Sequence, residues 1–472
     1  MRITCERKLK MFSNEENSAS KNFIISAAVW LVIGMFMGLT GAVEFVSPDM
    51  SANIPQITFS RIRPAHISTV AFGWLSMANI GIVLYVIPTL TKTRLYSERF
   101  ANFICFVWNL VILIGGICIL NGYTEGREYA EYPVPIDICV MIGLFALAFN
   151  VFMTTVNRKV KKLYVSMWYM LGAFFWMPIV YFIGNRTFIR LEGLNDGIVN
   201  WFYGHNILGM WFTTLGVGIA YYMIPKLTGR PLWSHSLSML GFWTIAFFYA
   251  PTGTHHILQS PVPEWLKALA VVFSVALVVP VITVLTNFFM TMKGAWWQIA
   301  NNLPLRFVLT GAVCYFLTCI QGPFQATRAV NWYIHFTQWV PGHAHLALLG
   351  TFSFFDWGAI YYIIPRILGR QIYSYGLARA HYWFTTIGFI IFFVAFTVAG
   401  LVQAAGWQQG MPVGQWSLAM EPWWICRAIG GGMMWFGNLL FLINLIQTFR
   451  GVAPLNPADE EPAMAPIKKV EA

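Results

Sequence analysis

The feature that most constrains this chain is a series of long apolar runs, each long enough to cross a bilayer as a helix. Short connections separate the runs and carry Pro, Gly, Asn and most of the charged residues, which make up only 10% of the chain. The sequence therefore predicts an all-α polytopic membrane protein with twelve transmembrane helices, forming one domain over residues 23–450. The twelve runs cover residues 23–46, 66–91, 100–121, 136–156, 163–184, 198–225, 236–257, 265–291, 304–324, 338–365, 376–404 and 423–449.

The positions of lysine and arginine predict the orientation of these helices. With the N-terminus inside, most of the 30 basic residues fall in tails and connections on the inner side, as the positive-inside rule requires. The net charge of +11 then reflects topology, and no nucleic-acid partner is needed to explain it. We expect residues 1–22 to form a cytoplasmic N-terminal tail and residues 451–472 to form a disordered cytoplasmic C-terminal tail.

Histidines converge at one depth of the predicted bundle, near its outer surface. Ionisable residues inside a membrane are costly and usually functional. A single histidine of this kind is more often an ordinary core residue, but six of them from four spans favour a metal-binding layer. The six are His66, His205, His255, His256, His343 and His345.

Three of these histidines could form one site. His255 and His256 are adjacent, about 100° apart around a helix, and His205 lies on the neighbouring span. Three imidazole ligands with an open position are typical of a reactive Cu, Zn or Fe site. Tyr249 precedes His256 by seven residues, so a continuous helix would place its phenol on the same face, about 10 Å deeper. There it could donate a proton and an electron to oxygen, although a tyrosine of the core or interface is the alternative.

The pair His343 and His345 cannot serve one small site, because residues at i and i+2 of a helix point about 200° apart. His345 and His66 could ligate one haem iron from two helices, which is the arrangement of an electron-transfer haem. His343 alone would leave the far side of a second haem open toward the three-histidine site.

Charged side chains flank this layer. Arg63, one turn before His66, carries a guanidinium group that matches a haem propionate. Arg328 lies at the same outer level, where snorkelling at the interface is an equal alternative. Glu128 and Glu131, at i and i+3 in a loop, could bind a hard cation such as Ca²⁺ or could simply be solvated.

With these residues the chain resembles the catalytic subunit of haem–copper oxidases, and most closely the C-family (cbb3-type) cytochrome c oxidases. The resemblance covers nearly all of the twelve spans. It rests on Arg63-Pro64-Ala65-His66, Gly126-Arg127-Glu128-Tyr129-Ala130-Glu131, Trp201-Phe202-Tyr203-Gly204-His205-Asn206, Tyr249 with His255-His256, and Gly342-His343-Ala344-His345.

The resemblance implies two haem b groups, one copper ion and a calcium ion near the haem propionates. The implied ligands are His66 and His345 for the low-spin haem iron, His343 for the high-spin haem iron, and His205, His255 and His256 for copper. The other implied roles are a redox-active Tyr249 cross-linked to His205, calcium binding by Glu128 and Glu131, and propionate contacts by Arg63 and His335.

The implied activity is that of a terminal respiratory oxidase in a bacterial inner membrane. It would reduce O₂ to water with electrons from membrane-anchored c-type cytochrome subunits of the same complex, coupled to proton uptake and pumping. The chain has no Cys-x-x-Cys-His motif for attaching a c-type haem of its own. The single proton path of the family would pass Tyr222, Thr244 and Asn287, of which Asn287 matches the family position best; ordinary helix–helix hydrogen bonding is the alternative.

Two positions depart from the family pattern. Gln321 stands where a glutamate usually accepts a hydrogen bond from the histidine that ligates the high-spin haem. Because an amide is a weaker acceptor than a carboxylate, we predict a higher reduction potential for that haem. Gln338 stands where the family often has Asp, so both changes remove negative charge near the haems.

Two other functions compete with this interpretation. Nitric oxide reductases, a sister family with iron in place of copper, carry a glutamate one turn after the first metal histidine, where this chain has Gly209. They carry another in the eighth span, whose segment 273–279 has no acid here. These absences, together with Tyr249, favour copper and O₂. A haem-free transporter would suit twelve spans, but transporters place their polar residues near the midplane.

Overall fold

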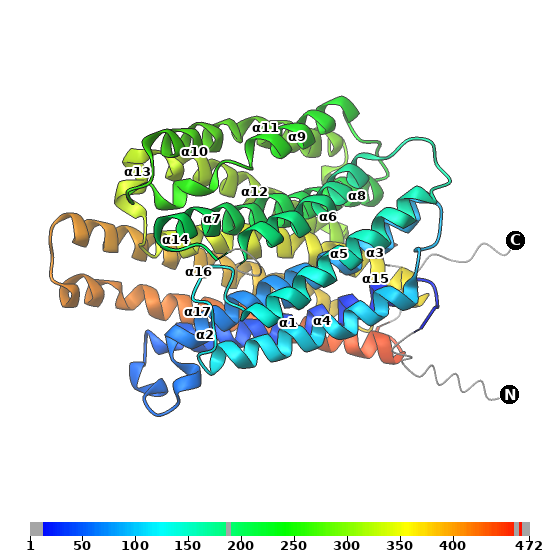
Figure 1. Cartoon of the computed structure of the whole chain (residues 1–472). Helices are drawn as coiled ribbons and strands as arrows, with labels where there is room; N and C mark the ends of the chain where they lie inside the picture. The colour runs from blue at the N-terminus through cyan, green and yellow to red at the C-terminus, as the bar shows by residue number, and fades with distance from the viewer. Residues whose placement is uncertain (1–12, 186–189, 457–461, 465–472) are drawn as a thin grey trace, which may run out of the picture.

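The computed structural model is helical and describes residues 13–185, 190–456 and 462–464. Within these ranges, eleven helices are long and apolar enough to span a membrane, and they lie side by side in one bundle (Figure 1). The predicted helical membrane fold is confirmed. Seven spans are single helices: α1 (Ser18–Glu44), α4 (Glu98–Leu120), α5 (Val134–Val156), α6 (Val165–Gly184), α12 (Leu303–Ala326), α16 (Tyr375–Gln408) and α17 (Val413–Arg450). An eighth joins α10 (Glu264–Ala276) to α11 (Val278–Thr291).

The remaining three spans form the centre of the bundle, and each contains a π-helical segment. In their most apolar stretches 94%, 94% and 83% of the residues are buried, against 33–56% in the other spans. These central spans are the ones that carry His66, His205, His343 and His345. They are α2 (Phe59–Ser68), η3 (Thr69–Ser76) and α3 (Met77–Thr91); α7 (Gly193–Asn206), η4 (Ile207–Thr213) and α8 (Thr214–Thr228); and α14 (Trp339–His345), η7 (Leu346–Ser353) and α15 (Phe354–Leu368).

The seventh predicted run, residues 236–257, contains a shorter helix. Its helix α9 (His235–Phe248) ends before Pro251, and the 3-10 helix η5 (Gly253–Ile257) follows. Proline lacks the N–H that a helix needs and disfavours helical geometry in the residue before it. The continuous-helix spacing that we predicted between Tyr249 and His256 is therefore wrong.

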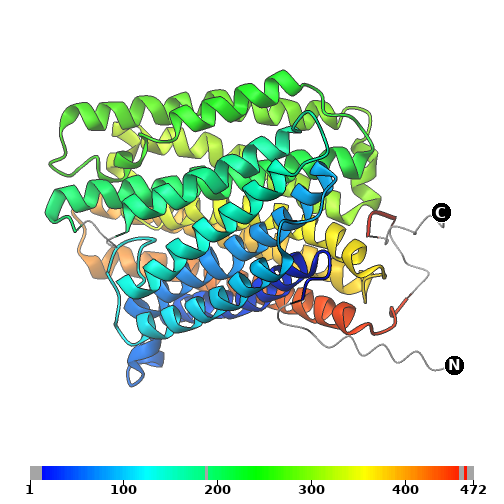
Figure 2. The ribbon, with the colours of Figure 1, turned by 45° about the vertical axis from the view of Figure 1, so that its right-hand side comes forward.

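Both ends of the helical bundle can be identified from the path of the chain. Helix α1 begins and α17 ends at the same end, which we call the tail end; it lies to the right in Figure 1, and Figure 2 shows it from a second direction. The opposite end, where α2 and α14 begin, we call the histidine end. Of the predicted tails 1–22 and 451–472, residues 1–12, 457–461 and 465–472 lie outside the described residues. Residues Pro462–Met464 form the short 3-10 helix η9.

Three helices begin at the tail end in the same way. A serine caps each helix by accepting a hydrogen bond from the backbone N–H three residues later, and an asparagine of the following span bonds to both the N–H and the carbonyl of that serine. Each serine follows a helical proline (Pro88, Pro225 or Pro365) by nine residues. The pairs are Ser97 with Asn150, Ser234 with Asn287 and Ser374 with Asn444.

Candidate metal centre

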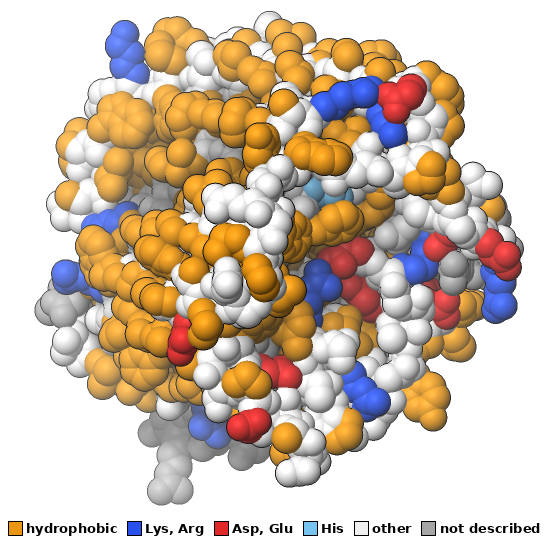
Figure 3. Space-filling model, turned by 90° about the vertical axis from the view of Figure 1, so that its left-hand side faces the viewer, with side chains coloured by type: hydrophobic (Ala, Val, Ile, Leu, Met, Phe, Trp, Pro, Cys, Tyr) orange, Lys and Arg blue, Asp and Glu red, His pale blue; other side chains and the backbone are white. Residues whose placement is uncertain are grey.

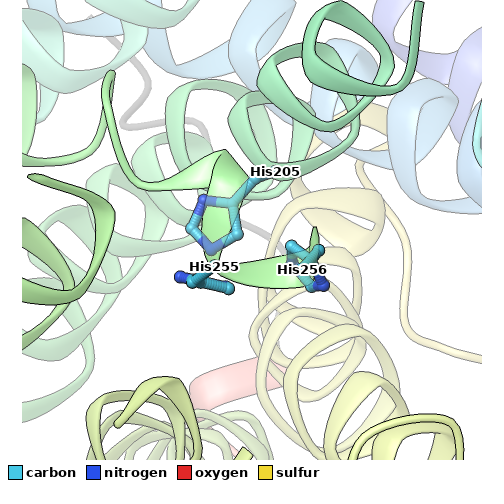
Figure 4. Close-up of side chains that lie close together, drawn as sticks. All are labelled: His205, His255 and His256. Atoms are coloured by element: carbon cyan, nitrogen blue, oxygen red, sulfur yellow. The ribbon is translucent and has the colours of Figure 1, made fainter. Parts of the chain in front are cut away.

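Three imidazoles meet at the histidine end, where α7 lies beside η5. His205, His255 and His256 each offer a ligand atom, and these atoms all lie within 4.8 Å of one another. The ring centroids of His205 lie 4.5 Å from His255 and 5.3 Å from His256. Figure 4 shows the three side chains converging from two segments far apart in sequence. The turn at Pro251 makes this possible, because it sends the chain back beside α7.

Hydrogen bonds define which ring nitrogens of this cluster are free. Thr252 donates its hydroxyl hydrogen to the carbonyl of Tyr249, so at 2.8 Å it must accept from Nδ1 of His205. Ser274 likewise donates to the carbonyl of Ala270 and accepts from Nδ1 of His255 at 2.7 Å. Both rings therefore keep an unprotonated Nε2, which is the atom that binds a metal.

The third ring of this cluster is held by stacking. His256 lies 4.0 Å from the ring of Trp201, nearly parallel to it at 12°. Its Nε2 is buried without a hydrogen-bond partner among the described residues. A buried polar atom of this kind requires an explanation, and a metal ion shared with His205 and His255 provides one. The donor set fits Cu, Zn or Fe.

Tyr249 lies directly beside this cluster. Its ring centroid is 4.9 Å from that of His205, although the helix does not continue to His256. Gly209, one turn after His205, faces the ring of Tyr249 so closely that a Cβ atom there would collide with it. The absence of a side chain at residue 209 thus creates the space that the tyrosine occupies.

A second group of imidazoles, a pair, is formed by His345 of α14 and His66 of α2. The rings of His66 and His345 are nearly parallel, at 14°, with centroids 6.3 Å apart. Nδ1 of His66 donates to the carbonyl of Gly34 and Nδ1 of His345 to that of Pro341, both at 2.7 Å. Since metal–imidazole bonds are about 2 Å long, the separation leaves room for one metal ion between two Nε2 atoms.

His343 contacts a different helix from His345, as their spacing in the sequence predicts. Its Nδ1 donates to Oε1 of Gln321 on α12 at 2.9 Å, whereas His345 packs against Phe392 and Phe396 of α16. Gln321, the residue that departs from the family pattern, is therefore in direct contact with the candidate ligand His343. Helix α14 separates the two candidate haem positions.

The acidic loop lies next to Arg63. Arg63 forms an ion pair with Glu128, with Nη2 and Oε1 2.6 Å apart. Glu131 is almost fully buried and accepts hydrogen bonds from the N–H of Tyr129 and the hydroxyl of Ser68. Burial and, next, the charge of Glu128 raise the pKa of Glu131 to about 8. A cation bound by both carboxylates would relieve this repulsion, and calcium binding by this loop stays a prediction.

Two further predicted residues lie at the histidine end, in different environments. His335 follows α13 (Arg328–Ile334); it is buried, and its Nδ1 has no hydrogen-bond partner among the described residues. Arg328 is 55% exposed and pairs with Glu264 at 2.9 Å, and its contact with a haem propionate stays a prediction. Figure 3 shows this end, with histidine atoms visible near basic and acidic side chains.

The three predicted proton-path residues are not joined by a contact that the structure records. Tyr222 is buried near the tail end, with the ammonium of Lys226 5.8 Å from its ring centre. Thr244 donates its hydroxyl hydrogen to the carbonyl of Leu240 within its own helix. Asn287 uses its amide on the backbone of Ser234, as Asn150 and Asn444 do elsewhere. Their role in proton transfer stays a prediction.

Three residues around the metal centre could not be singled out from the sequence. Thr252 and Ser274 orient two histidines, and Trp201 stacks on the third. A lone hydroxyl or indole in an apolar span carries no signal that distinguishes it from ordinary core packing. Arg427 also lies at the histidine end. It is buried on α17, contacts Oε1 of Gln338 at 3.3 Å and lies over the ring of Phe45.

Comparison with known proteins agrees with this geometry. Residues 18–433 match the family model of cytochrome c and quinol oxidase polypeptide I. The cbb3-type cytochrome c oxidase subunit CcoN1 of Stutzerimonas stutzeri is 32% identical over 459 residues, 94% of this chain and 96% of that protein. A nitric oxide reductase subunit of the same organism is 24% identical, over 92% of this chain and 93% of that one. A haem-copper terminal oxidase dimer solved by cryo-EM has the same fold, with a TM-score of 0.77 over 96% of this chain and 87% of that one, at 17% identity.

Proposed function

This chain belongs to the cytochrome c and quinol oxidase polypeptide I family and is a multi-pass membrane protein, and we propose that it is the catalytic subunit of a cbb3-type cytochrome c oxidase. Membership of this family implies haem and copper. The observation that carries the proposal is the cluster of His205, His255 and His256, whose ligand atoms lie within 4.8 Å of one another. Two of these rings have Nδ1 engaged as a donor, which leaves Nε2 for a metal.

We assign the cofactors to the histidines as follows. His205, His255 and His256 would bind one copper ion. His343 would ligate a high-spin haem b. His66 and His345 would ligate a low-spin haem b, and the 6.3 Å between their parallel rings supports this pairing. Once bound, the copper and the high-spin haem supply the electrons and the coordination positions at which O₂ is reduced to water.

The protein's own side chains prepare this chemistry. Thr252 and Ser274 hold two imidazoles in the tautomer that can ligate a metal. Tyr249 would supply a proton and an electron from its phenol. Its contact with the ring of His205 supports the covalent cross-link between these residues that the family implies. Gln321 would orient His343 without adding negative charge.

The rival function, nitric oxide reduction, is disfavoured at two positions. A glutamate at residue 209 would occupy the space of the Tyr249 ring. In the eighth span, where that family has an acid, the residue that reaches the cluster is Ser274, through its hydrogen bond to His255. The chain therefore has neither carboxylate with which a reductase would bind iron and relay protons.

The remaining assignments concern the surroundings of the site. Arg63 and His335 would contact haem propionates, and Glu128 and Glu131 would hold a calcium ion. Arg328 is assigned to the surface pair with Glu264. Membrane-anchored c-type cytochrome subunits would deliver electrons, and protons would be taken up and pumped through a path that includes Tyr222, Thr244 and Asn287. The complex would lie in a bacterial inner membrane with the tail end in the cytoplasm.

One set of measurements on the purified complex tests this function. We expect two b haems per chain by absorbance, one copper ion by metal analysis, and O₂ turnover well above NO turnover under matched conditions. Preparations that hold both haems but no copper, and that reduce NO faster than O₂, would overturn the proposal in favour of a reductase.

A further inference from the structure

Each of the three central spans changes from α-helix to π-helix just after a candidate metal ligand. The π segment η3 begins three residues after His66, η4 two residues after His205 and η7 one residue after His345. A π turn contains an extra residue, which rotates everything on one side of it relative to the other, and such turns occur frequently at functional sites. The rotational setting of these histidines therefore depends on the π segments.

Hydroxyl groups stabilise all three π segments in the same way. In each, a serine or threonine donates a hydrogen bond to the carbonyl five residues earlier, across the widened turn. The bonds are Ser76 to Ala71, Thr213 to Leu208, Thr214 to Gly209, Thr351 to Leu346 and Ser353 to Leu348, over 2.8–3.2 Å.

Two of these serines also receive a hydrogen bond from a neighbouring central span. Trp211 of η4 donates its indole N–H to Ser76 of η3 at 3.0 Å. Trp74 of η3 donates to Ser353 of η7 at 2.8 Å. A serine hydroxyl has one hydrogen to donate and lone pairs to accept with, so each serine holds its own π turn and binds its neighbour. All four side chains are almost completely buried.

We propose that Trp74, Trp211, Ser76 and Ser353 form an indole–hydroxyl lock that sets the rotation of the three histidine-bearing helices relative to one another. The lock would link the helix of His205 to that of His66, and the helix of His66 to that of His343 and His345. The four are positioning residues, and the inference rests on the proposed function. In the low-dielectric interior an unpaired indole N–H is costly, so each bond favours one arrangement of its two helices.

The chain contains a matched control for this lock. Trp357 is as fully buried as Trp211, and its ring stacks on that of Trp74 with centroids 5.9 Å apart. Its indole N–H has no hydrogen-bond partner among the described residues. Replacing Trp357 by Phe removes a similar volume from the same region without breaking an interhelical hydrogen bond.

The test compares Trp74→Phe, Trp211→Phe and Trp357→Phe in the assembled complex. The readouts are haem and copper content, turnover, and the optical and electron paramagnetic resonance signature of the low-spin haem. We expect Trp211→Phe to alter the low-spin haem signature and to slow turnover about tenfold. The haem effect is diagnostic, because Trp211 lies on the helix of the copper ligand His205 and is bonded to the helix of His66 through Ser76. Trp74→Phe should do the same, while Trp357→Phe should match the wild type. If both lock variants behave like Trp357→Phe, the inference is overturned.

A second pair of variants decides the question even where Trp211→Phe does not accumulate. Ser76→Thr keeps the hydroxyl group and should retain the wild-type haem signature, whereas Ser76→Ala should alter it. Combined with Trp211→Phe, Ser76→Ala should lose less than the sum of the two single variants, because both remove the Trp211–Ser76 bond and only Ser76→Ala also removes the bond to Ala71. Equal behaviour of the Thr and Ala variants, or additive losses, would contradict the lock. Failure of the proposed function has a different signature, since the wild-type complex itself would then lack haem or copper.

Discussion

At the scale of single residues, five of the six candidate histidine ligands donate a hydrogen bond from Nδ1, but the acceptor differs between them. Nδ1 of His66 and His345 donates to backbone carbonyls, Nδ1 of His205 to a hydroxyl, and Nδ1 of His343 to an amide. Nδ1 of His255 also donates to a hydroxyl, that of Ser274. None of these acceptors carries a charge. Because a carboxylate partner makes an imidazole a stronger ligand, neutral acceptors would leave metals bound here easier to reduce.

Gln321, the acceptor for His343, gives the most direct test of these neutral acceptors. We expect Gln321→Glu to lower the potential of the high-spin haem by roughly 60 mV, a tenfold change in equilibrium constant for one electron, because a carboxylate would give His343 imidazolate character. A spectroscopic redox titration of the complex measures it. Gln325→Glu, one turn further along α12 and bonded to Trp339, is the control. If the reduction potential of the high-spin haem stays constant or rises in Gln321→Glu, the amide of Gln321 does not determine that potential.

Gly209 supports a second prediction at this scale. A methyl group at residue 209 would collide with the ring of Tyr249, so Gly209→Ala should displace the tyrosine and slow O₂ reduction at least about tenfold. The low-spin haem spectrum should be unchanged. Gly197→Ala on the same helix, where a Cβ meets no atom within 4 Å, serves as the control. Wild-type turnover in Gly209→Ala would show that the position of the ring is not critical.

At the scale of helices, the sequence allowed prediction of what periodicity and composition determine. The membrane runs and the depth of His66, His205, His255, His256 and His343 could be inferred because apolar length and residue position suffice for them. The π segments could not be placed, because they depend on side-chain hydrogen bonds across the widened turn and to other helices. The break near Pro251 has a signal in the proline itself, but apolar length alone did not show it. Ser76 illustrates the limit: its partner Trp211 is 135 residues away.

The repeated serine–asparagine caps give a prediction at this scale. Asn287→Ala and Asn150→Ala each leave the N–H of a serine unpaired and remove one of the two hydrogen bonds of its carbonyl, so each should destabilise the protein by about 1–3 kcal/mol. Thermal unfolding of the two variants side by side measures this. If Asn287 also belongs to the proton path, only Asn287→Ala should slow turnover. Equal turnover in both variants would confine Asn287 to its capping role.

At the scale of the whole molecule, the fold separates two candidate metal-binding regions by a single helix. Helix α14 carries His343 toward α12 and His345 toward α2 and α16. The regions lie at the histidine end, whereas α1 begins and α17 ends at the tail end (Figure 1). In the proposed oxidase, electrons passing between the two regions would cross only α14, while protons taken up at the tail end would pass through most of the bundle.

This separation predicts that ligands can be removed from one region without emptying the other. His205→Ala removes one of three copper donors but no contact of His66 or His345, so it should abolish turnover, lower the copper content and leave the low-spin haem spectrum intact. His66→Ala should do the reverse, abolishing the low-spin signal while copper is retained, because the three-histidine cluster lies on the far side of α14. Absorbance spectra and metal analysis of the two purified variants measure both effects. Loss of the low-spin signal in His205→Ala would mean that the histidines are paired differently, because His205 would then contribute to the low-spin haem site on the other side of α14.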